Sequence, residues 1–222
     1  MPLAMHRAFC ARVRAVQRVS CGFSPDFRVP GFSYSWSEPL TLAPNFSGVL
    51  KMEITTVGII GAGTMGNGIA QACAVSGIKV VMVDISEAAV AKGVATVSGS
   101  LDRLLKKEKI TAEAKAAALA HIQGSTSYDD LKGAQLVIEA ATENYDLKVK
   151  IVKQLDALLP PDVIIASNTS SISITKLAAV TGRPDRFIGM HFFNPVPMMA
   201  LVEIIRGLQT SDATHAAVHA MA

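Results

Sequence analysis

The segment Gly61-Ala62-Gly63-Thr64-Met65-Gly66 constrains the fold of this chain most, because it directly follows the apolar run Val57–Ile60. In such a turn the first glycine allows a sharp bend, the second lets a pyrophosphate approach the backbone, and the third lets the next helix pack closely. The free N–H groups at the helix start suit an anion. The segment therefore predicts dinucleotide contacts from Gly61, Gly63, Thr64, Met65 and Gly66. A glycine-rich turn without a ligand is the alternative.

Asp84 ends the next apolar run, Val80–Val83. A carboxylate at this position accepts hydrogen bonds from the ribose hydroxyls of adenosine and repels a 2′-phosphate. Asp84 therefore predicts NAD rather than NADP as the cofactor. An aspartate that caps a loop before Ser86 and Glu87 is the alternative interpretation, and the two roles are compatible.

Residues 1–51 differ in composition from the rest of the 222-residue chain, since they hold most of its aromatic residues and only two acids, Asp26 and Glu38. The excess positive charge belongs to this leader, so residues 52–222 give no reason to predict nucleic-acid binding. An Arg-rich leader is typical of an organelle presequence, but Met52 stands directly before the first predicted strand. We favour upstream sequence that lies outside the fold. The expected location is the cytoplasm, or the mitochondrial matrix if the leader is a presequence.

Cys10, Cys21 and Cys73 are too few for a disulfide framework and indicate a reducing compartment. Cys73 is expected in a helix core. Glycines and polar residues interrupt every long apolar run, so no membrane span is predicted. No residue is assigned to a metal.

From Ile54 onward, short apolar runs alternate with amphipathic segments, which is typical of a Rossmann-type, doubly wound α/β fold with a mostly parallel sheet. Strands are predicted over residues 57–60, 80–83, 136–140, 163–167, 186–191 and 201–205, and helices over about 64–74, 90–105, 111–121, 147–159 and 174–180. Gly182 is the expected C′ residue of the last helix. The pair of helices before residue 121 is expected to be an insertion. The NAD-binding domain is assigned to residues 52–206.

Polar residues follow the predicted strands at the edge where parallel α/β sheets bind ligands. Glu143 and Asn144 follow one strand, residues 167–171 follow the next, and His191 ends a third. These three segments are expected to meet at one edge of the sheet.

His191 and Glu203 lie six residues to either side of Pro197. If the chain turns at Pro197 and the last strand runs back beside the strand before it, the two side chains face each other. A carboxylate partner orients an imidazole and stabilises its charge, as a catalytic base requires. A structural His–Glu pair is the alternative.

With these residues in place, residues 52–222 resemble the N-terminal domain of the 3-hydroxyacyl-CoA dehydrogenases, most closely the bacterial 3-hydroxybutyryl-CoA type. The resemblance rests on four blocks, Gly61–Gly66, Glu139–Asn144, Ser167–Ser171 and His191–Pro197. It implies hydride transfer between C3 of an acyl-CoA thioester and NAD, with His191 as general acid or base and Glu203 as its partner.

The resemblance also implies roles for further residues. It places Ser170 on the substrate oxygen, and Glu143 and Lys148 near the nicotinamide and its ribose. Ala140 and Asn168 are assigned to the cofactor and Asn194 to the substrate. Lys107, or one of its neighbours Lys106 and Lys109, is assigned to the phosphates of coenzyme A.

Members of this family continue into a helical domain that forms the dimer interface. Residues 207–222 are therefore expected to begin that domain, and the complete form is expected to be a homodimer. Two alternatives stay open: an NAD-binding protein without turnover, and a dehydrogenase of a free hydroxy acid. The intact set of Ser170, His191 and Glu203 weighs against the first alternative.

Overall fold

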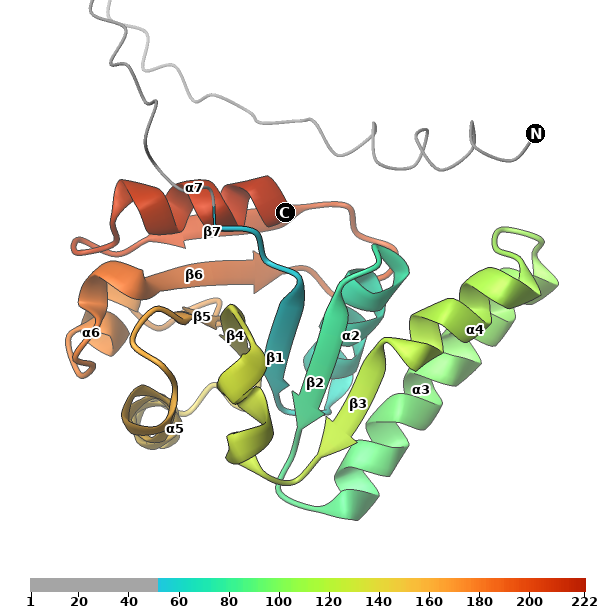
Figure 1. Cartoon of the computed structure of the whole chain (residues 1–222), viewed down its shortest axis with the longest axis horizontal. Helices are drawn as coiled ribbons and strands as arrows, with labels where there is room; N and C mark the ends of the chain where they lie inside the picture. The colour runs from blue at the N-terminus through green and yellow to red at the C-terminus, as the bar shows by residue number, and fades with distance from the viewer. Residues whose placement is uncertain (1–51) are drawn as a thin grey trace, which may run out of the picture. The chain divides into compact units, whose positions relative to one another are not determined.

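In residues 52–222, which the computed structural model describes, seven strands form one sheet in the order β3-β2-β1-β4-β5-β6-β7 (Figure 1). The strands are β1 (Thr56–Ile60), β2 (Lys79–Val83), β3 (Ile122–Ser125), β4 (Leu136–Glu139), β5 (Ile164–Ser167), β6 (Phe187–Phe192) and β7 (Val202–Arg206). All neighbours are parallel except β6 and β7, which are antiparallel. The predicted Rossmann-type, mostly parallel sheet is confirmed. The predicted leader, residues 1–51, lies outside the described residues.

Helices cover both faces of the sheet and bury its mainly apolar strands. They are α2 (Thr64–Val75), α3 (Glu87–Lys106), α4 (Ala112–Ala120), η1 (Tyr128–Gly133), α5 (Tyr145–Leu158), α6 (Ile174–Ala178), η2 (Pro184–Arg186) and α7 (Asp212–Met221). One core cluster joins the sheet to α2, α3, α4 and α7, and the second joins it to η1, α5 and α6. The strand order reverses direction between β1 and β4, and this switch point is where an open α/β sheet binds its ligand.

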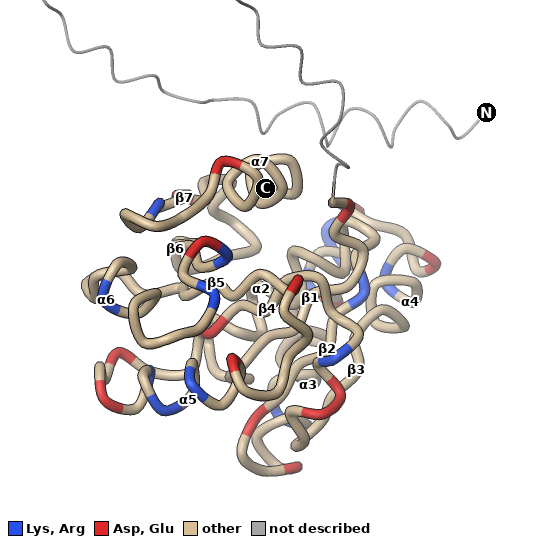
Figure 2. Tube along the Cα trace, turned by 60° about the vertical axis from the view of Figure 1, so that its left-hand side comes forward, with Lys and Arg blue, Asp and Glu red and all other residues tan. Residues whose placement is uncertain are grey.

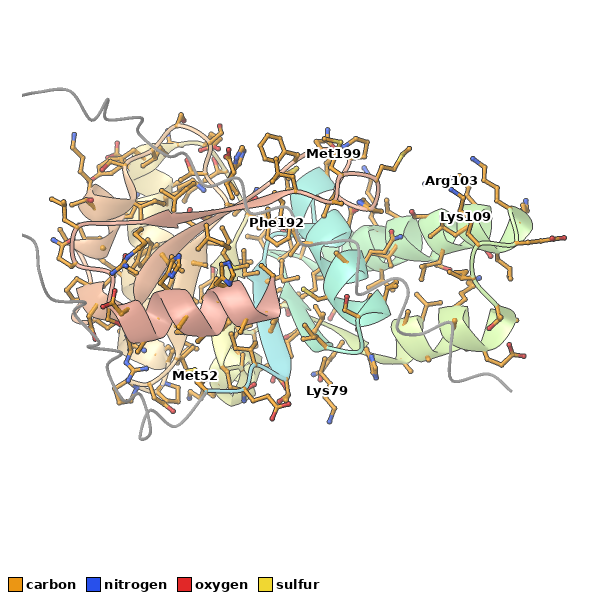
Figure 3. All side chains as sticks on the ribbon, turned by 90° about the horizontal axis from the view of Figure 1, so that it is seen from above. Met52, Lys79, Arg103, Lys109, Phe192 and Met199 are labelled. Atoms are coloured by element: carbon orange, nitrogen blue, oxygen red, sulfur yellow. The ribbon has the colours of Figure 1, made fainter. Side chains whose placement is uncertain are left out.

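The predicted helical insertion is present as α3 and α4. Each begins after a side-chain cap: Ser86 accepts from the backbone N–H of Ala89, and Thr111 accepts from that of Ala114. At 1.5 Å per residue, the 20 residues of α3 span about 30 Å. Figure 3 shows Arg103 and Lys109 at the outer end of this pair, remote from Phe192.

Three short elements, β3, η1 and η2, escape prediction, and one local prediction is wrong. The edge strand β3 was not predicted, because Ile122 is the only large apolar residue in Ile122–Ser125 and no alternation is visible. The 3-10 helix η1 was also missed. Gly182 is not the C′ residue of α6, since that helix ends at Ala178 and the Gly182 N–H instead donates to Asp156 Oδ2 at 2.7 Å.

α7, in the segment predicted to begin a separate helical domain, packs through Ala217 and Val218 into the core cluster that contains β6. The boundary after residue 206 stays a prediction. Cys73 is buried in α2 as expected, and burial raises the pKa of its thiol to about 12.

Basic and acidic residues are interspersed along the described part of the chain (Figure 2). Within residues 52–222, no helix is long and apolar enough to cross a membrane. The same residues contain no group of three or more His, Cys, Asp or Glu side chains placed to hold a metal ion.

Candidate cofactor and active site

The glycine turn between β1 and α2 depends on three glycines for three different reasons. Gly61 has a φ of 100°, in the left-handed region that favours glycine. A Cβ on Gly66 would lie 1.7 Å from the carbonyl oxygen of Gly61, so only glycine lets α2 pack this closely. A Cβ on Gly63 would meet nothing within 4 Å, so the space above it is open. The turn fits a pyrophosphate, because α2 starts here without a side-chain cap on its N–H groups.

Asp84 lies directly after β2 and contacts the glycine turn. Its Oδ2 accepts from the backbone N–H of Ala62 at 2.6 Å, and its Oδ1 accepts from that of Ile85 at 2.7 Å. The carboxylate is thereby held beside the turn, where a ribose would meet it. Ser86 caps α3, whereas Asp84 accepts from N–H groups of the two loops, so the loop-capping role is present and is compatible with a ribose contact.

A pocket opens between the glycine turn and the ends of β4 and β5. It is lined by Gly63, Thr64, Met65, Ala140, Ala141, Thr142, Glu143, Lys148 and Asn168. All predicted cofactor residues except Gly61, Gly66 and Asp84 therefore lie on this one pocket. Those three shape the turn beside it.

Glu143 joins the loops that follow β4 and β5. Its Oε2 accepts from Thr169 Oγ at 2.7 Å, and its Oε1 accepts from the N–H and the hydroxyl of Ser170 at 2.9 and 3.3 Å. Partial burial opposes the charge, but these hydrogen bonds and the positive charge of Lys148 hold the pKa of Glu143 below its usual value. Glu143 is thus ionised at neutral pH and fixes the position of Ser170 next to the pocket.

His191 and Glu203 are paired across β6 and β7, as the symmetric spacing about Pro197 predicted. The imidazole Nδ1 lies 2.8 Å from Glu203 Oε2. Because an ionised carboxylate only accepts hydrogen bonds, Nδ1 carries the hydrogen and Nε2 of the neutral ring is the free base. The ring centroids of Phe193 and His191 lie 4.6 Å apart, and the two ring planes are inclined by 56°. Glu203 and Phe193 together thus orient the imidazole of His191.

Asn168 links the cofactor pocket to the strand that carries His191. Its Oδ1 accepts from the backbone N–H of Phe192 at 2.9 Å. Since a backbone N–H needs an acceptor, this bond also fixes which end of the amide is oxygen. This hydrogen bond therefore connects the strand that carries His191 to a residue that lines the pocket.

Sequence reasoning missed two residues beneath the pocket, Glu139 and Ser167. Both are completely buried, and Glu139 Oε2 accepts from Lys148 Nζ at 2.5 Å and from Ser167 Oγ at 2.8 Å. Two signals were available. Glu139 is a charged residue at the end of an apolar central strand, and Lys148 falls on the buried stripe that continues at Ile151 and Leu155 of α5.

None of the three predicted substrate residues lines the cofactor pocket: Ser170 lies beside it, and Lys107 and Asn194 lie elsewhere. Lys107 follows the last turn of α3, about 30 Å along the helix from Glu87, and Lys106 and Lys109 share this outer end. Asn194 is exposed in the connection between β6 and β7. Their assignment to the substrate stays a prediction.

The sheet, the glycine turn at its switch point and the acid after β2 define the class of protein: a dinucleotide-binding α/β domain. Residues 56–222 match the family model described as 3-hydroxyacyl-CoA dehydrogenase, NAD binding domain. The chain belongs to this family, and its cofactor is NAD.

Individual relatives agree with the family. The chain is 53% identical over 161 residues to the 3-hydroxybutyryl-CoA dehydrogenase of Bradyrhizobium diazoefficiens, which covers 72% of this chain and 55% of the relative. It is 47% identical over 156 residues to the enzyme of the same name from Clostridioides difficile, with 70% and 56% covered. The crystal structure of (S)-3-hydroxybutyryl-CoA dehydrogenase from Ralstonia eutropha superposes with a TM-score of 0.75 at 78% identity, covering 76% of this chain and 60% of that one. The chain thus spans little more than half the length of these relatives.

Proposed function

We propose that this chain provides the cofactor site and the acid–base residues of an NAD-dependent 3-hydroxyacyl-CoA dehydrogenase that acts on short acyl chains. The reaction interconverts a 3-hydroxyacyl-CoA and a 3-oxoacyl-CoA. The names of the bacterial relatives support this substrate class. The observation that carries the proposal is the His191–Glu203 pair, 2.8 Å apart, on the strand that Asn168 joins to the cofactor pocket.

His191 is the general acid and base of this proposal. When the alcohol is oxidised, Nε2 takes the hydroxyl proton, and the imidazolium is stabilised by Glu203 through Nδ1. When the ketone is reduced, the same nitrogen returns the proton. NAD, when bound, accepts or supplies the hydride.

The other residues orient the substrate. We assign the hydroxyl of Ser170 to the substrate oxygen, because Glu143 holds the Ser170 backbone at the edge of the pocket. Asn194 keeps its assignment to the substrate, and Lys107 keeps its assignment to the phosphates of coenzyme A. Homodimerisation of the complete protein belongs to the same proposal.

NADH oxidation with acetoacetyl-CoA, compared with free acetoacetate, tests the proposal. Because the chain spans about 60% of the Ralstonia relative, the assay uses the chain itself and a fusion that adds the part of that relative beyond the match, hereafter the fusion chain. We expect turnover of the thioester only. Equal turnover of free acetoacetate would indicate a dehydrogenase of hydroxy acids, and NADH binding without turnover in both chains would indicate a non-catalytic binding protein.

A further inference from the structure

The network of Glu139, Lys148 and Ser167 is the most completely buried group of polar side chains next to the cofactor pocket. The exposed fractions are 0% for Glu139, 1% for Lys148 and 0% for Ser167. A buried ion pair of this kind is weak evidence for stability, because the loss of hydration offsets the attraction. Stability alone therefore does not explain why this ion pair lies next to the cofactor pocket.

Both carboxylate oxygens of Glu139 accept hydrogen bonds from its neighbours. Oε2 accepts from Lys148 Nζ and Ser167 Oγ, and Oε1 accepts from the backbone N–H of Ala141 at 2.9 Å. The side chain is therefore held by three elements at once: the end of β4, the end of β5 and the first turns of α5. It has little freedom to move.

Lys148 has hydrogen-bonding capacity left over. An ammonium group has three donors, of which one goes to Glu139 at 2.5 Å and a second approaches Ser167 Oγ at 3.5 Å. Lys148 also lines the cofactor pocket, although it is almost completely buried. One N–H therefore remains for a group that enters the pocket.

We propose that Glu139 and Ser167 are positioning residues, which hold the Lys148 ammonium charged and aimed so that its remaining donor binds the nicotinamide-side ribose of NAD. The inference rests on the proposed function and concerns the same pocket. Glu139 touches no cofactor in this assignment, since it acts through Lys148.

Two titratable groups that interact with Lys148 or Glu139 have shifted pKa values, and both shifts move titration away from neutrality. Glu143, on the loop after β4, has a pKa below its usual value. Tyr128, on η1, has a raised pKa, first because of burial and then because of the negative charges of Glu139 and Asp84. Neither group titrates between about pH 6 and pH 9.

The test measures the NADH dissociation constant by fluorescence titration, and unfolding by urea, for the whole chain and its variants. In Glu139→Gln the buried amine loses its counter-charge, and burial then favours its neutral form. We expect NADH binding about tenfold weaker at pH 9 than at pH 6 in this variant, and flat in the unaltered chain. A packing defect would weaken binding equally at both pH values.

Three further variants separate positioning from stability. Asp156→Asn breaks a second ion pair of α5, the partly buried pair with Arg183, and is the matched control: it should lower the urea midpoint and leave the NADH dissociation constant unchanged. Ser167→Ala should weaken NADH binding by about threefold. The double variant Glu139→Gln/Lys148→Met leaves no charge in this buried network, so it should fold and yet bind NADH at least about tenfold more weakly than the unaltered chain.

The outcomes distinguish this inference from the proposed function. If the unaltered chain fails to bind NADH, the proposed function and the positioning role both fall. If the unaltered chain binds NADH, and the folded double variant binds it within about twofold as well, only the positioning role is overturned and the pair is structural. A flat pH profile of Glu139→Gln would overturn the charge argument in the same way.

Discussion

The glycine turn after β1 and the strand pair β6–β7 build the two halves of the site by different means. The turn uses backbone: the positive φ of Gly61, the close approach of Gly66 and the open space above Gly63. The strand pair uses side chains, because its register sets His191 against Glu203. The first half is therefore suited to binding the cofactor and the second to proton transfer, and substitutions should separate the two functions.

The largest expected effect concerns the strand pair β6–β7, to which we assign proton transfer. In the fusion chain, His191→Gln should lower kcat with acetoacetyl-CoA by about 10² to 10⁴-fold, because the proton acceptor is lost. The NADH dissociation constant should stay the same, since the cofactor contacts are intact. Glu203→Gln should act in the same direction and less strongly. Near-normal turnover by His191→Gln would remove the histidine from the mechanism.

The next effect concerns the part of the relatives that this chain does not span. The fusion chain should turn over acetoacetyl-CoA about a hundredfold faster than the 222-residue chain, because misplaced reacting groups are costly. Both chains should bind NADH with similar affinity, as the predicted cofactor residues lie in residues 52–222. Similar kcat/KM values for the two chains would contradict this division.

Gly63→Ala tests the glycine turn, the half of the site to which we assign cofactor binding. The new methyl group meets no protein atom within 4 Å, so the fold should persist while NADH binding weakens at least about tenfold. Gly99→Ala in α3 is the matched control, because it too meets nothing within 4 Å. It should stabilise the helix by about 0.5–1 kcal/mol and leave NADH binding unchanged. Calorimetric titration measures NADH binding, and thermal unfolding measures stability. If Gly63→Ala bound NADH as tightly as the unaltered chain, the assignment of the pyrophosphate to this turn would be wrong.

Asp84 should produce the smallest effect, on cofactor choice. We expect the unaltered chain to bind NADH more tightly than NADPH, and Asp84→Ser to narrow that difference by about tenfold, because a charge-assisted ribose contact and a repulsion are lost together. Titration with both cofactors checks this. Equal affinity of the unaltered chain for NADH and NADPH would contradict the role of Asp84.

The sequence predicts most of this fold because its central strands are mainly apolar and many of its turns carry glycine or proline. The edge strand β3 escapes prediction, since Ile122–Ser125 is too polar and short to be distinguished from a loop, and it forms by pairing with β2. The end of α6 also depends on tertiary contacts, because Asp156 of α5 takes the Gly182 N–H.

The same difference applies to the site. The His191–Glu203 pair follows from one turn and a local antiparallel register, so its spacing predicts it. The Glu139–Ser167 contact joins residues 28 positions apart on neighbouring parallel strands, and its geometry depends on the register of β4 and β5. No local spacing contains that information.

The central claim is that the glycine turn binds the cofactor and the strand pair β6–β7 transfers the proton. A double-variant cycle on NADH affinity tests this claim most directly. The cycle compares the unaltered chain, Gly63→Ala, His191→Gln and the double variant. We predict that His191→Gln binds like the unaltered chain and that the double variant binds like Gly63→Ala, each within about twofold, because the two sites act independently on the cofactor. A weakening of NADH binding by His191→Gln, or a double variant much weaker than Gly63→Ala, would contradict the separation.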